Sequence, residues 1–243
     1  MSAPGIQALD WDSDHYAVPV GQIEPSVQTP DRLHTALTTA AAGGMRLVYW
    51  LSTDAFVPDR QMLSRFGGQR IVGYRRYLRP LTALDRDRLA DPRCASVAGE
   101  RPDQTVLELA LLAGVSSRFR LDRRLPPGRF EAMYERWITK SLSRDLADDV
   151  LVLRDTDGQT RALLTYRVEE ATARIGLVAT SLAAQGQGFG SAMLAEAHRQ
   201  IAQVGADNVI VSTQSENRAA CRFYEASGYA VVFQGTHYHF LMP

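Results

Sequence analysis

Hydrophobic residues in the second half of the chain recur with two different spacings. Continuous or alternating apolar runs predict strands at residues 150–154, 162–168, 173–180, 209–212 and 229–241. Apolar residues spaced as on one helix face predict helices at residues 105–114, 130–146 and 217–227. A further long helix follows a glycine-rich turn. Its apolar face would consist of Met193, Leu194, Ala197, Ile201 and Val204.

The first half of the chain alternates between the same two patterns. Strands are expected at residues 18–23, 45–51 and 70–78, and helices at residues 31–42 and 58–66. The next segment is rich in Pro, Asp and Arg, which favours a linker. We therefore predict an N-terminal α/β domain at residues 1–79, a linker at 80–103 and a larger domain at 104–243. The expected fold class is α/β with a mixed sheet.

The charge balance excludes some classes of partner. The 243 residues include 27 Lys and Arg against 27 Asp and Glu, so the formal net charge is zero. This removes any global electrostatic argument for nucleic acid or for an acidic membrane surface. No apolar run has the length of a transmembrane helix, and the start of the chain lacks a signal-peptide pattern. We expect a cytoplasmic protein that does not insert into membranes.

The sequence indicates no metal or redox site. Cys94 and Cys221 have no recognisable metal-binding or redox spacing. Cys221 lies among small apolar residues of a predicted helix, so we expect it on the packing side. His237 and His239 share one face of the last strand, but no further ligand is evident near them in the sequence.

The most informative segment is the turn formed by Gln185, Gly186, Gln187, Gly188, Phe189 and Gly190, followed by Ser191. A glycine-rich turn between a strand and a helix exposes several backbone N–H groups, which suit a pyrophosphate. A plain tight turn is the alternative. A dinucleotide site would need an acidic residue at the end of a second strand, and a triphosphate loop would need a lysine. Neither pattern fits this turn.

The turn resembles the acetyl-CoA pyrophosphate loop of the GCN5-related N-acetyltransferases (GNAT), whose pattern is Gln/Arg-x-x-Gly-x-Gly/Ala. The matching residues are Gln185, Gly188 and Gly190. A second segment resembles the pattern Asn-x-x-Ala-x-x-x-Tyr of the same family, with Asn217 and Tyr224 at its two ends. The order of helices and strands in the second half is also that of the acetyltransferase fold. On this resemblance, the first half would be a smaller α/β domain or a shortened, diverged copy of the same fold.

The resemblance implies roles for these residues, with acetyl-CoA as cosubstrate. The turn from Gln185 to Ser191 would hold the pyrophosphate, and Asn217 would reach the pantetheine arm. Tyr224 would protonate the departing thiolate as general acid. A splayed strand would offer the amide of Leu177, Val178 or Ala179 to the thioester oxygen. The alternatives are a core aromatic for Tyr224 and a helix N-cap for Asn217.

Further segments resemble the bacterial TDP-fucosamine N-acetyltransferases, which acetylate a nucleotide-linked amino-deoxysugar. They include the run from Ser117 to Arg120, and Trp137 on the following helix. The resemblance implies that Arg118 and Arg120 hold phosphate oxygens, since guanidinium groups match them. Trp137 could stack on a sugar or base, and His239 could act as a base. A solvated basic turn and a core tryptophan are the alternatives.

Three hypotheses follow for the function. The first is N-acetyl transfer to a TDP-linked amino sugar by direct attack in a ternary complex. The second is the same reaction on another small amine or a peptide amine, and the third is a non-catalytic acyl-CoA sensor. A homodimer is compatible with each, because exposed strand edges of such a sheet often pair.

Overall fold

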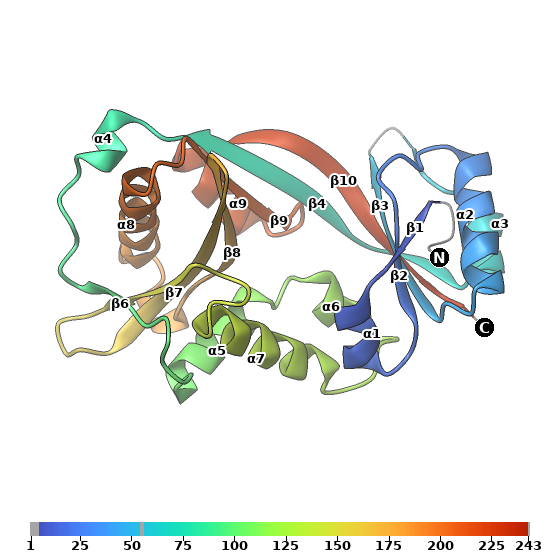
Figure 1. The fold of residues 1–243 in the computed structure, drawn as a ribbon, viewed down its shortest axis with the longest axis horizontal. Helices are drawn as coiled ribbons and strands as arrows, with labels where there is room; N and C mark the ends of the chain where they lie inside the picture. The colour runs from blue at the N-terminus through green and yellow to red at the C-terminus, as the bar shows by residue number, and fades with distance from the viewer. Residues whose placement is uncertain (1–4, 54–55, 243) are drawn as a thin grey trace.

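A computed structural model describes residues 5–53 and 56–242 and arranges them around one long mixed sheet (Figure 1). Within these residues the sheet has ten strands, in the order β1-β2-β3-β10-β4-β9-β8-β7-β6-β5. The strands are β1 (Ile6–Ala8), β2 (Val20–Ile23), β3 (Leu47–Thr53), β4 (Gly68–Pro80), β5 (Cys94–Ser96), β6 (Asp149–Arg154), β7 (Thr160–Glu169), β8 (Thr172–Thr180), β9 (Asn208–Gln214) and β10 (Ala230–Leu241). The fold class expected from the sequence is confirmed.

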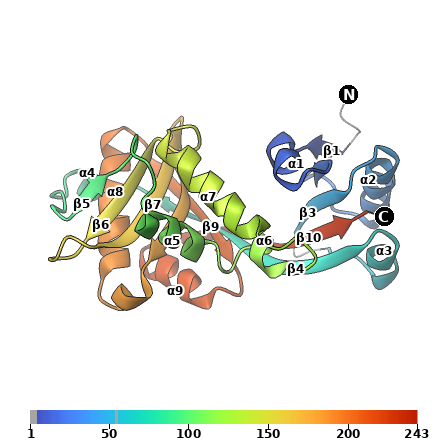
Figure 2. The ribbon, with the colours of Figure 1, turned by 90° about the horizontal axis from the view of Figure 1, so that it is seen from below.

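Helices cover both faces of this sheet (Figure 2). They are α1 (Asp10–Tyr16), α2 (Pro30–Ala42), α3 (Arg60–Arg65), α4 (Ala83–Arg86), α5 (Gln104–Ala113), α6 (Arg118–Leu121), α7 (Arg129–Leu142), the short 3-10 turn η1 (Leu182–Ala184), α8 (Phe189–Gln203) and α9 (Arg218–Ala226). In the second half, α5 and α7 pack on one face of the sheet, and α8 and α9 pack on the other. In the first half, α2 and α3 cover a third hydrophobic cluster.

The two halves of the sheet mirror each other in topology. The order β2-α2-β3-α3-β4 in the first half recurs as β8-α8-β9-α9-β10 in the second. β2 is parallel to β3 and β8 is parallel to β9, whereas all other neighbouring strands are antiparallel. The last strands are exchanged, because β4 pairs with β9 and β10 pairs with β3. This arrangement supports the prediction that the first half is a shortened copy of the second.

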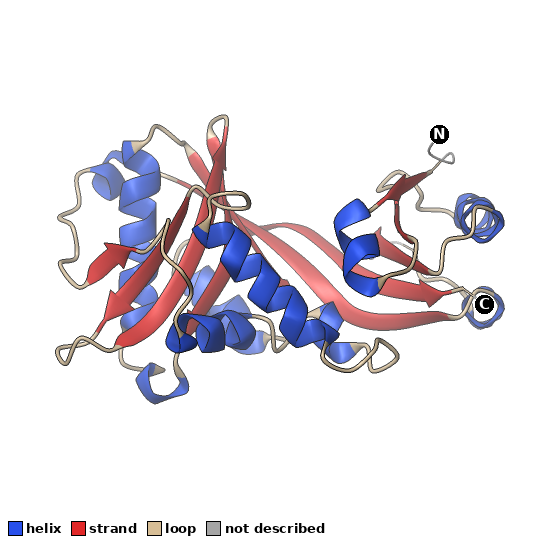
Figure 3. Ribbon diagram, turned by 60° about the horizontal axis from the view of Figure 1, so that its bottom comes forward, coloured by secondary structure: helices blue, strands red, loops and turns tan. Residues whose placement is uncertain are grey.

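The exchanged strands β4 and β10 join the two ends of the molecule (Figure 3). They pair with each other from Ala230 opposite Leu78 to Phe240 opposite Gly68. Residue 79, where the sequence predicts the first domain to end, lies one residue before the end of β4. The predicted linker at 80–103 contains α4 and β5, and β5 pairs with β6 at the edge of the sheet.

Most sequence-predicted elements are present, and three details need correction. α1, with three aspartates among its seven residues, was not predicted. Val204 and Leu146 lie beyond the ends of α8 and α7 and are 65% and 38% exposed, so neither belongs to an apolar helix face. Cys221 is buried as expected, but it shares its cluster with Tyr224 because residues three apart on a helix lie on the same face.

Acidification is expected to weaken this fold through buried histidines. His198 on α8 lies 2.7 Å from the Tyr229 hydroxyl, and burial, with the nearby Arg79 charge, lowers its pKa to about 4. The unfolded chain, with a pKa of about 6.5, therefore takes up a proton that the folded chain does not. Between pH 6.5 and 5 the free energy of unfolding should fall by roughly 2 kcal/mol for this residue.

Urea unfolding at pH 7.5 and 5.0 measures the effect. His198→Gln should flatten the pH dependence, whereas Tyr229→Phe should lower stability without flattening it, because the histidine remains buried. An unchanged pH dependence in His198→Gln would contradict the assignment.

Candidate functional site

The parallel strands β8 and β9 separate along their length. They pair only from Thr172 opposite Asn208 to Arg174 opposite Ile210. β8 continues to Thr180 and β9 continues to Gln214, but these later residues do not pair with each other. Backbone groups on the facing edges of the two strands are thus open to another extended chain, as in strand addition.

A bulge in β8 decides which amides face this opening. The register with β7 shifts between Val178 opposite Leu164 and Ile175 opposite Tyr166. The Leu177 amide donates to Thr165 Oγ1 at 2.9 Å, and the Ser181 amide donates to the Arg161 carbonyl at 2.8 Å. Because successive amides of a strand alternate in direction, the Ala179 amide also faces β7, and the Val178 amide faces the opening. Of the three predicted thioester contacts, Val178 is the one so oriented.

The glycine turn lies at the end of β8 and starts α8. Gly186 and Gly188 have φ angles of +75° and +84°, a region that favours glycine, and a Cβ at either would meet no atom within 4 Å. Residues 185–188 are exposed. The side chains of Gln185 and Gln187 fold back on the carbonyls of Thr180 and Ala183, at 3.3 and 2.7 Å. The turn thus combines exposed backbone with the positive end of a fifteen-residue helix.

Gly190 brings this turn close to α9. A Cβ at Gly190 would lie 3.3 Å from Thr180 Oγ1 and 3.5 Å from the Phe223 ring. The end of β8, the start of α8 and the middle of α9 therefore meet at one point. Phe189 and Ser191 lie in the first turn of α8, half-buried and exposed respectively.

The corresponding helix of the first half has a different beginning. α2 follows β2 as α8 follows β8, but it opens with Thr29, Pro30 and Asp31 in place of glycines. Proline lacks an N–H donor, and the aspartate adds a negative charge. We infer that only the second half has a turn suited to phosphate.

α9 holds Asn217 and Tyr224. Asn217 is the N-cap, and its side chain accepts a hydrogen bond from the Ala220 amide at 3.2 Å. The Tyr224 ring is buried against Tyr77 and Tyr229, with ring centroids 5.8 and 5.7 Å away. Burial raises the pKa of Tyr224, so its phenol stays protonated at neutral pH. This burial fits a core aromatic as well as a general acid, and only kinetics separate them.

The four predicted acceptor residues do not all lie together. Trp137 is half-buried on α7, and its indole nitrogen lies 4.0 Å from the point where Gly176 of β8 would carry a Cβ. Arg118 lies over the Tyr49 ring, 3.9 Å from its centroid. Arg120, on the same short helix, instead lies 3.8 Å from Glu131. Arg118 and Arg120 therefore do not form one cationic pair.

His239 is enclosed in a charged network. Its side chain is fully buried, and Nδ1 lies 2.9 Å from Asp122 Oδ2. Burial lowers the pKa of His239 to about 4, although Asp122 opposes this, so the ring is neutral at pH 7 and Nδ1–H donates to the carboxylate. The Arg124 guanidinium binds the same carboxylate through Nε and Nη2, each at 2.9 Å.

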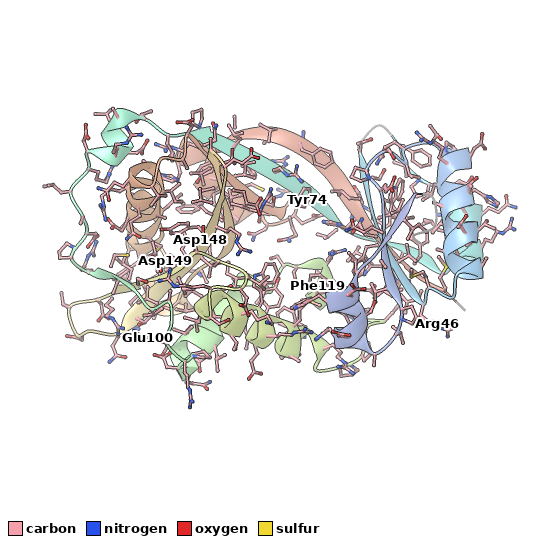
Figure 4. The ribbon with its side chains drawn as sticks, viewed as in Figure 1. Arg46, Tyr74, Glu100, Phe119, Asp148 and Asp149 are labelled. Atoms are coloured by element: carbon pink, nitrogen blue, oxygen red, sulfur yellow. The ribbon has the colours of Figure 1, made fainter. Side chains whose placement is uncertain are left out.

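The first half contributes residues that the sequence did not indicate. Tyr74 of β4 has its hydroxyl 2.7 Å from Ser212 Oγ on β9, on the part of that strand that pairs with β4 but not with β8. Figure 4 labels Tyr74 on β4 and Phe119 on α6, above and below the middle of the molecule. Only the exchange of β4 into the second half brings Tyr74 here, and no local pattern reports such an exchange.

Two further classes of site find no support among the described residues. No helix in them is long and apolar enough to span a membrane. The same residues contain no group of three metal-ligating side chains placed for an ion.

Comparison with known proteins bears on the whole arrangement. Residues 118–229 match the model of the acetyltransferase (GNAT) family. No curated protein matches the sequence. Among solved structures, a functionally unknown conserved protein from Staphylococcus epidermidis ATCC 12228 is 16% identical, with a TM-score of 0.64, and the match covers 94% of this chain and 86% of that chain.

Two other solved structures are similar over nearly the full length. A GCN5-related N-acetyltransferase from Kribbella flavida is 18% identical, with a TM-score of 0.59 and coverage of 99% and 88%. A putative acetyltransferase of the GNAT family from Novosphingobium aromaticivorans DSM 12444 is 14% identical, with a TM-score of 0.57 and coverage of 100% and 91%. At these identities the likeness shows the fold alone, and none of the three descriptions names a sugar. The part of the chain that matches the acetyltransferase (GNAT) family model contains both the separated strands and the glycine turn, so the match and the candidate site coincide.

Proposed function

We propose that this protein transfers the acetyl group of acetyl-CoA to an amine. One observation carries the proposal: β8 and β9 separate beside an exposed glycine turn at the start of α8. An extended pantetheine arm can lie between the separated strands while the pyrophosphate meets the amides of residues 185–191. These are the two needs of a coenzyme A site, and they occur at one place in the fold.

The chemistry follows from the groups around this opening. The Val178 amide faces it and would stabilise the thioester oxygen as negative charge develops. Asn217, at the start of α9, would meet the pantetheine arm. The amine would attack the carbonyl carbon directly, the C–S bond would break, and Tyr224 would give its proton to the departing sulfur. The proton lost by the amine nitrogen would pass through water and restore the phenol. The buried phenol suits this step because it stays protonated at neutral pH.

As the acceptor we propose the amino group of a TDP-linked amino-deoxysugar. Trp137, beside Gly176 of β8, is placed to stack on a ring near the opening. Arg118 has no salt-bridge partner among the described residues and would meet a phosphate, while Arg120 is already near Glu131. His239 would help to position Asp122 and Arg124 and would not contact the acceptor itself, since its side chain is fully enclosed.

An assay of thiol release from acetyl-CoA with a panel of amines tests both levels of the proposal. The panel contains a TDP-amino-deoxysugar, a polyamine, an aminoglycoside and a short peptide with a free N-terminus. Turnover of the nucleotide sugar at least equal to every other amine supports the full proposal. If another amine is acetylated faster, the proposed acetyl transfer stands but the nucleotide sugar is ruled out as the preferred acceptor. If acetyl-CoA binds but no amine is acetylated, the proposed enzymatic activity is overturned and a non-catalytic acyl-CoA sensor is favoured.

Gly188→Ala is expected to weaken coenzyme A binding about 10-fold, because its methyl group would occupy open space at the turn where we propose that the pyrophosphate lies. Gly158→Ala in the β6–β7 hairpin is the matched control. Gly158 also has a left-handed φ, of +77°, and open space around its Cβ position. Both variants bear a similar backbone penalty of about 1–2 kcal/mol. Isothermal titration should show a weaker affinity for coenzyme A only in Gly188→Ala. Equal affinities of the two variants would contradict the proposed pyrophosphate site.

A further inference from the structure

A group of buried polar atoms without partners lies where α1 and α6 meet β3 and β10. Among the described residues, the Tyr16 and Tyr49 hydroxyls, Arg118 Nη1, His237 Nδ1 and His239 Nε2 are enclosed and form no hydrogen bond. Buried polar atoms in native proteins nearly always have a partner, so such a group calls for a ligand or ordered water. We call these five residues the orphan cluster.

Arg118 is the charged member of the orphan cluster. Its guanidinium carbon lies 3.9 Å from the Tyr49 ring centroid and 4.5 Å from that of Phe119, so two aromatic rings fix its position. No carboxylate of the described residues lies within 4.0 Å of it, whereas Arg120 and Arg124 on neighbouring turns each have one. A half-buried guanidinium fixed in this way, with no carboxylate of the described residues in salt-bridge contact, is suited to bind an anion.

Of the charged side chains near the orphan cluster, Arg118 is the one that we assign to binding an anion. Asp122 is already held by Arg124 and His239. Asp12 is half-buried and near enough for its charge to interact with Arg118; burial raises its pKa and Arg118 opposes that rise. The Tyr16 hydroxyl lies near the Tyr49 hydroxyl, which in turn lies near Asp12, so a bound anion would have to take the place of Asp12 as the acceptor for Tyr49. Burial raises the pKa of both phenols, which keeps them protonated as donors. One cation with two hydroxyl donors matches the oxygens of a carboxylate or phosphate.

A line of side chains connects the orphan cluster to the separated strands. The His239 ring lies 4.6 Å from Tyr49, and His237 is two residues earlier on β10, facing the same side. The His237 ring lies 5.1 Å from that of Tyr74, whose hydroxyl reaches Ser212 on β9. An acceptor lying along this line would present one end to Arg118 and the other to the thioester.

We propose that the acceptor is an anionic amine, whose carboxylate or phosphate is bound by Arg118 with the Tyr16 and Tyr49 hydroxyls while its amino group points toward Tyr74 and Ser212. This inference rests on the proposed acetyl transfer and adds which residues would hold the anionic end of the acceptor and which would face its amino group, for a nucleotide sugar or any other anionic amine. It also gives the first half of the chain a function, because Tyr16, Tyr49 and Tyr74 all come from it. The shortened copy, without its own phosphate-binding turn, would serve as the acceptor-binding half of the enzyme.

Isothermal titration of the coenzyme A complex with three probes tests the inference. The probes are 4-aminobutyrate, O-phosphoethanolamine and n-butylamine, which carry a carboxylate, a phosphate and no anion. At least one anionic probe should bind 10-fold or more tightly than n-butylamine, in line with a charge-assisted contact of about 1.4 kcal/mol or more. The two anionic probes distinguish a carboxylate from a phosphate acceptor.

Arg118→Gln should weaken binding of the favoured anionic probe by about 10-fold and leave n-butylamine unchanged. Arg120→Gln is the matched control on the same helix and should change neither. Arg118→Lys keeps the charge and should bind more tightly than Arg118→Gln, which guards against a folding defect; melting temperatures of all variants are measured in parallel. Equal binding of neutral and anionic probes, no binding of any probe, or equal affinity in Arg118→Gln and wild type would overturn the inference.

The outcome is separable from that of the acetyl-transfer proposal. Binding requires no turnover, so anion-dependent binding can stand even if no thiol is released with any amine. Conversely, thiol release that is fastest with uncharged amines would support acetyl transfer and overturn the anionic acceptor.

Discussion

Replacing Tyr224 by phenylalanine is expected to lower kcat of acetyl transfer by about 10²-fold, the range that general acid catalysis usually contributes. Tyr224 follows Phe223 on α9, and the Phe223 ring lies 3.5 Å from the Cβ position of Gly190, where the end of β8 and the start of α8 meet. Without the Tyr224 proton, the departing thiolate would have to take one from water. The substitution removes one oxygen and keeps the ring that packs against Tyr77 and Tyr229. Stability should therefore change much less than turnover.

Tyr229→Phe is the matched control for this prediction. Tyr229 is equally buried in the same cluster, but its hydroxyl lies 2.7 Å from His198 and points away from the proposed reaction. Its loss should lower the melting temperature and leave kcat within about 2-fold of wild type. Steady-state kinetics with the preferred amine at saturating acetyl-CoA measure both variants. A wild-type kcat in Tyr224→Phe would remove the general-acid role and leave Tyr224 as a core aromatic.

The sequence predicts those parts of the fold and site that depend on neighbours along the chain. Helix faces, the β6–β7 hairpin and the glycine turn each depend on residues within a few positions, so a local pattern reports them. Gln185 to Ser191 are placed as expected at the start of α8, and Asn217 is the N-cap of α9. The sequence also shows that the turn before α2 differs from the glycine turn before α8, since α2 begins with Pro30.

The residues proposed to surround the acceptor depend on contacts between distant segments of the chain, which no local sequence pattern encodes. Tyr74 and Ser212 are 138 residues apart, and Asp122 and His239 are 117 apart. Both pairs arise because β4 and β10 are exchanged between the two halves of the sheet. The pattern of charges around Asp12 likewise does not reveal that α1 brings this carboxyl near Arg118 and Tyr49.

Because β4 and β10 are exchanged, Asp122 connects the two halves of the molecule. Its side chain has no exposed surface and accepts hydrogen bonds from His239 Nδ1, from Arg124 Nε and Nη2, and from the Arg124 amide at 3.1 Å. Arg124 in turn donates to the carbonyls of Gly67 and His239. One carboxylate therefore links the segment after α6 to both exchanged strands. Hydrogen bonds from these groups hold the pKa of Asp122 well below its usual value despite burial.

Asp122→Ala is expected to lower the free energy of unfolding by about 2–4 kcal/mol, because it leaves the half-buried Arg124 guanidinium without its counter-ion and the buried His239 ring without its acceptor. For a chain of this size the melting temperature should fall by on the order of 10 °C. The contribution of the carboxylate is present above the unfolded pKa of about 3.9 and is lost as pH falls through the lower folded value. Calorimetry and urea unfolding at pH 7 measure the change at full strength.

Glu131→Ala provides the control, because its pair with Arg120 spans 3.8 Å with about half of each side chain exposed. Exposed pairs contribute little, so this variant should change stability by less than about 1 kcal/mol. Asp122→Asn keeps one oxygen acceptor but loses the charge, and it should fall between wild type and Asp122→Ala. If Asp122→Ala were no less stable than Glu131→Ala, the charged network would not be what fixes α6 and Arg118 against the exchanged strands. The orphan cluster would then owe its position to the aromatic packing of Tyr49 and Phe119 alone.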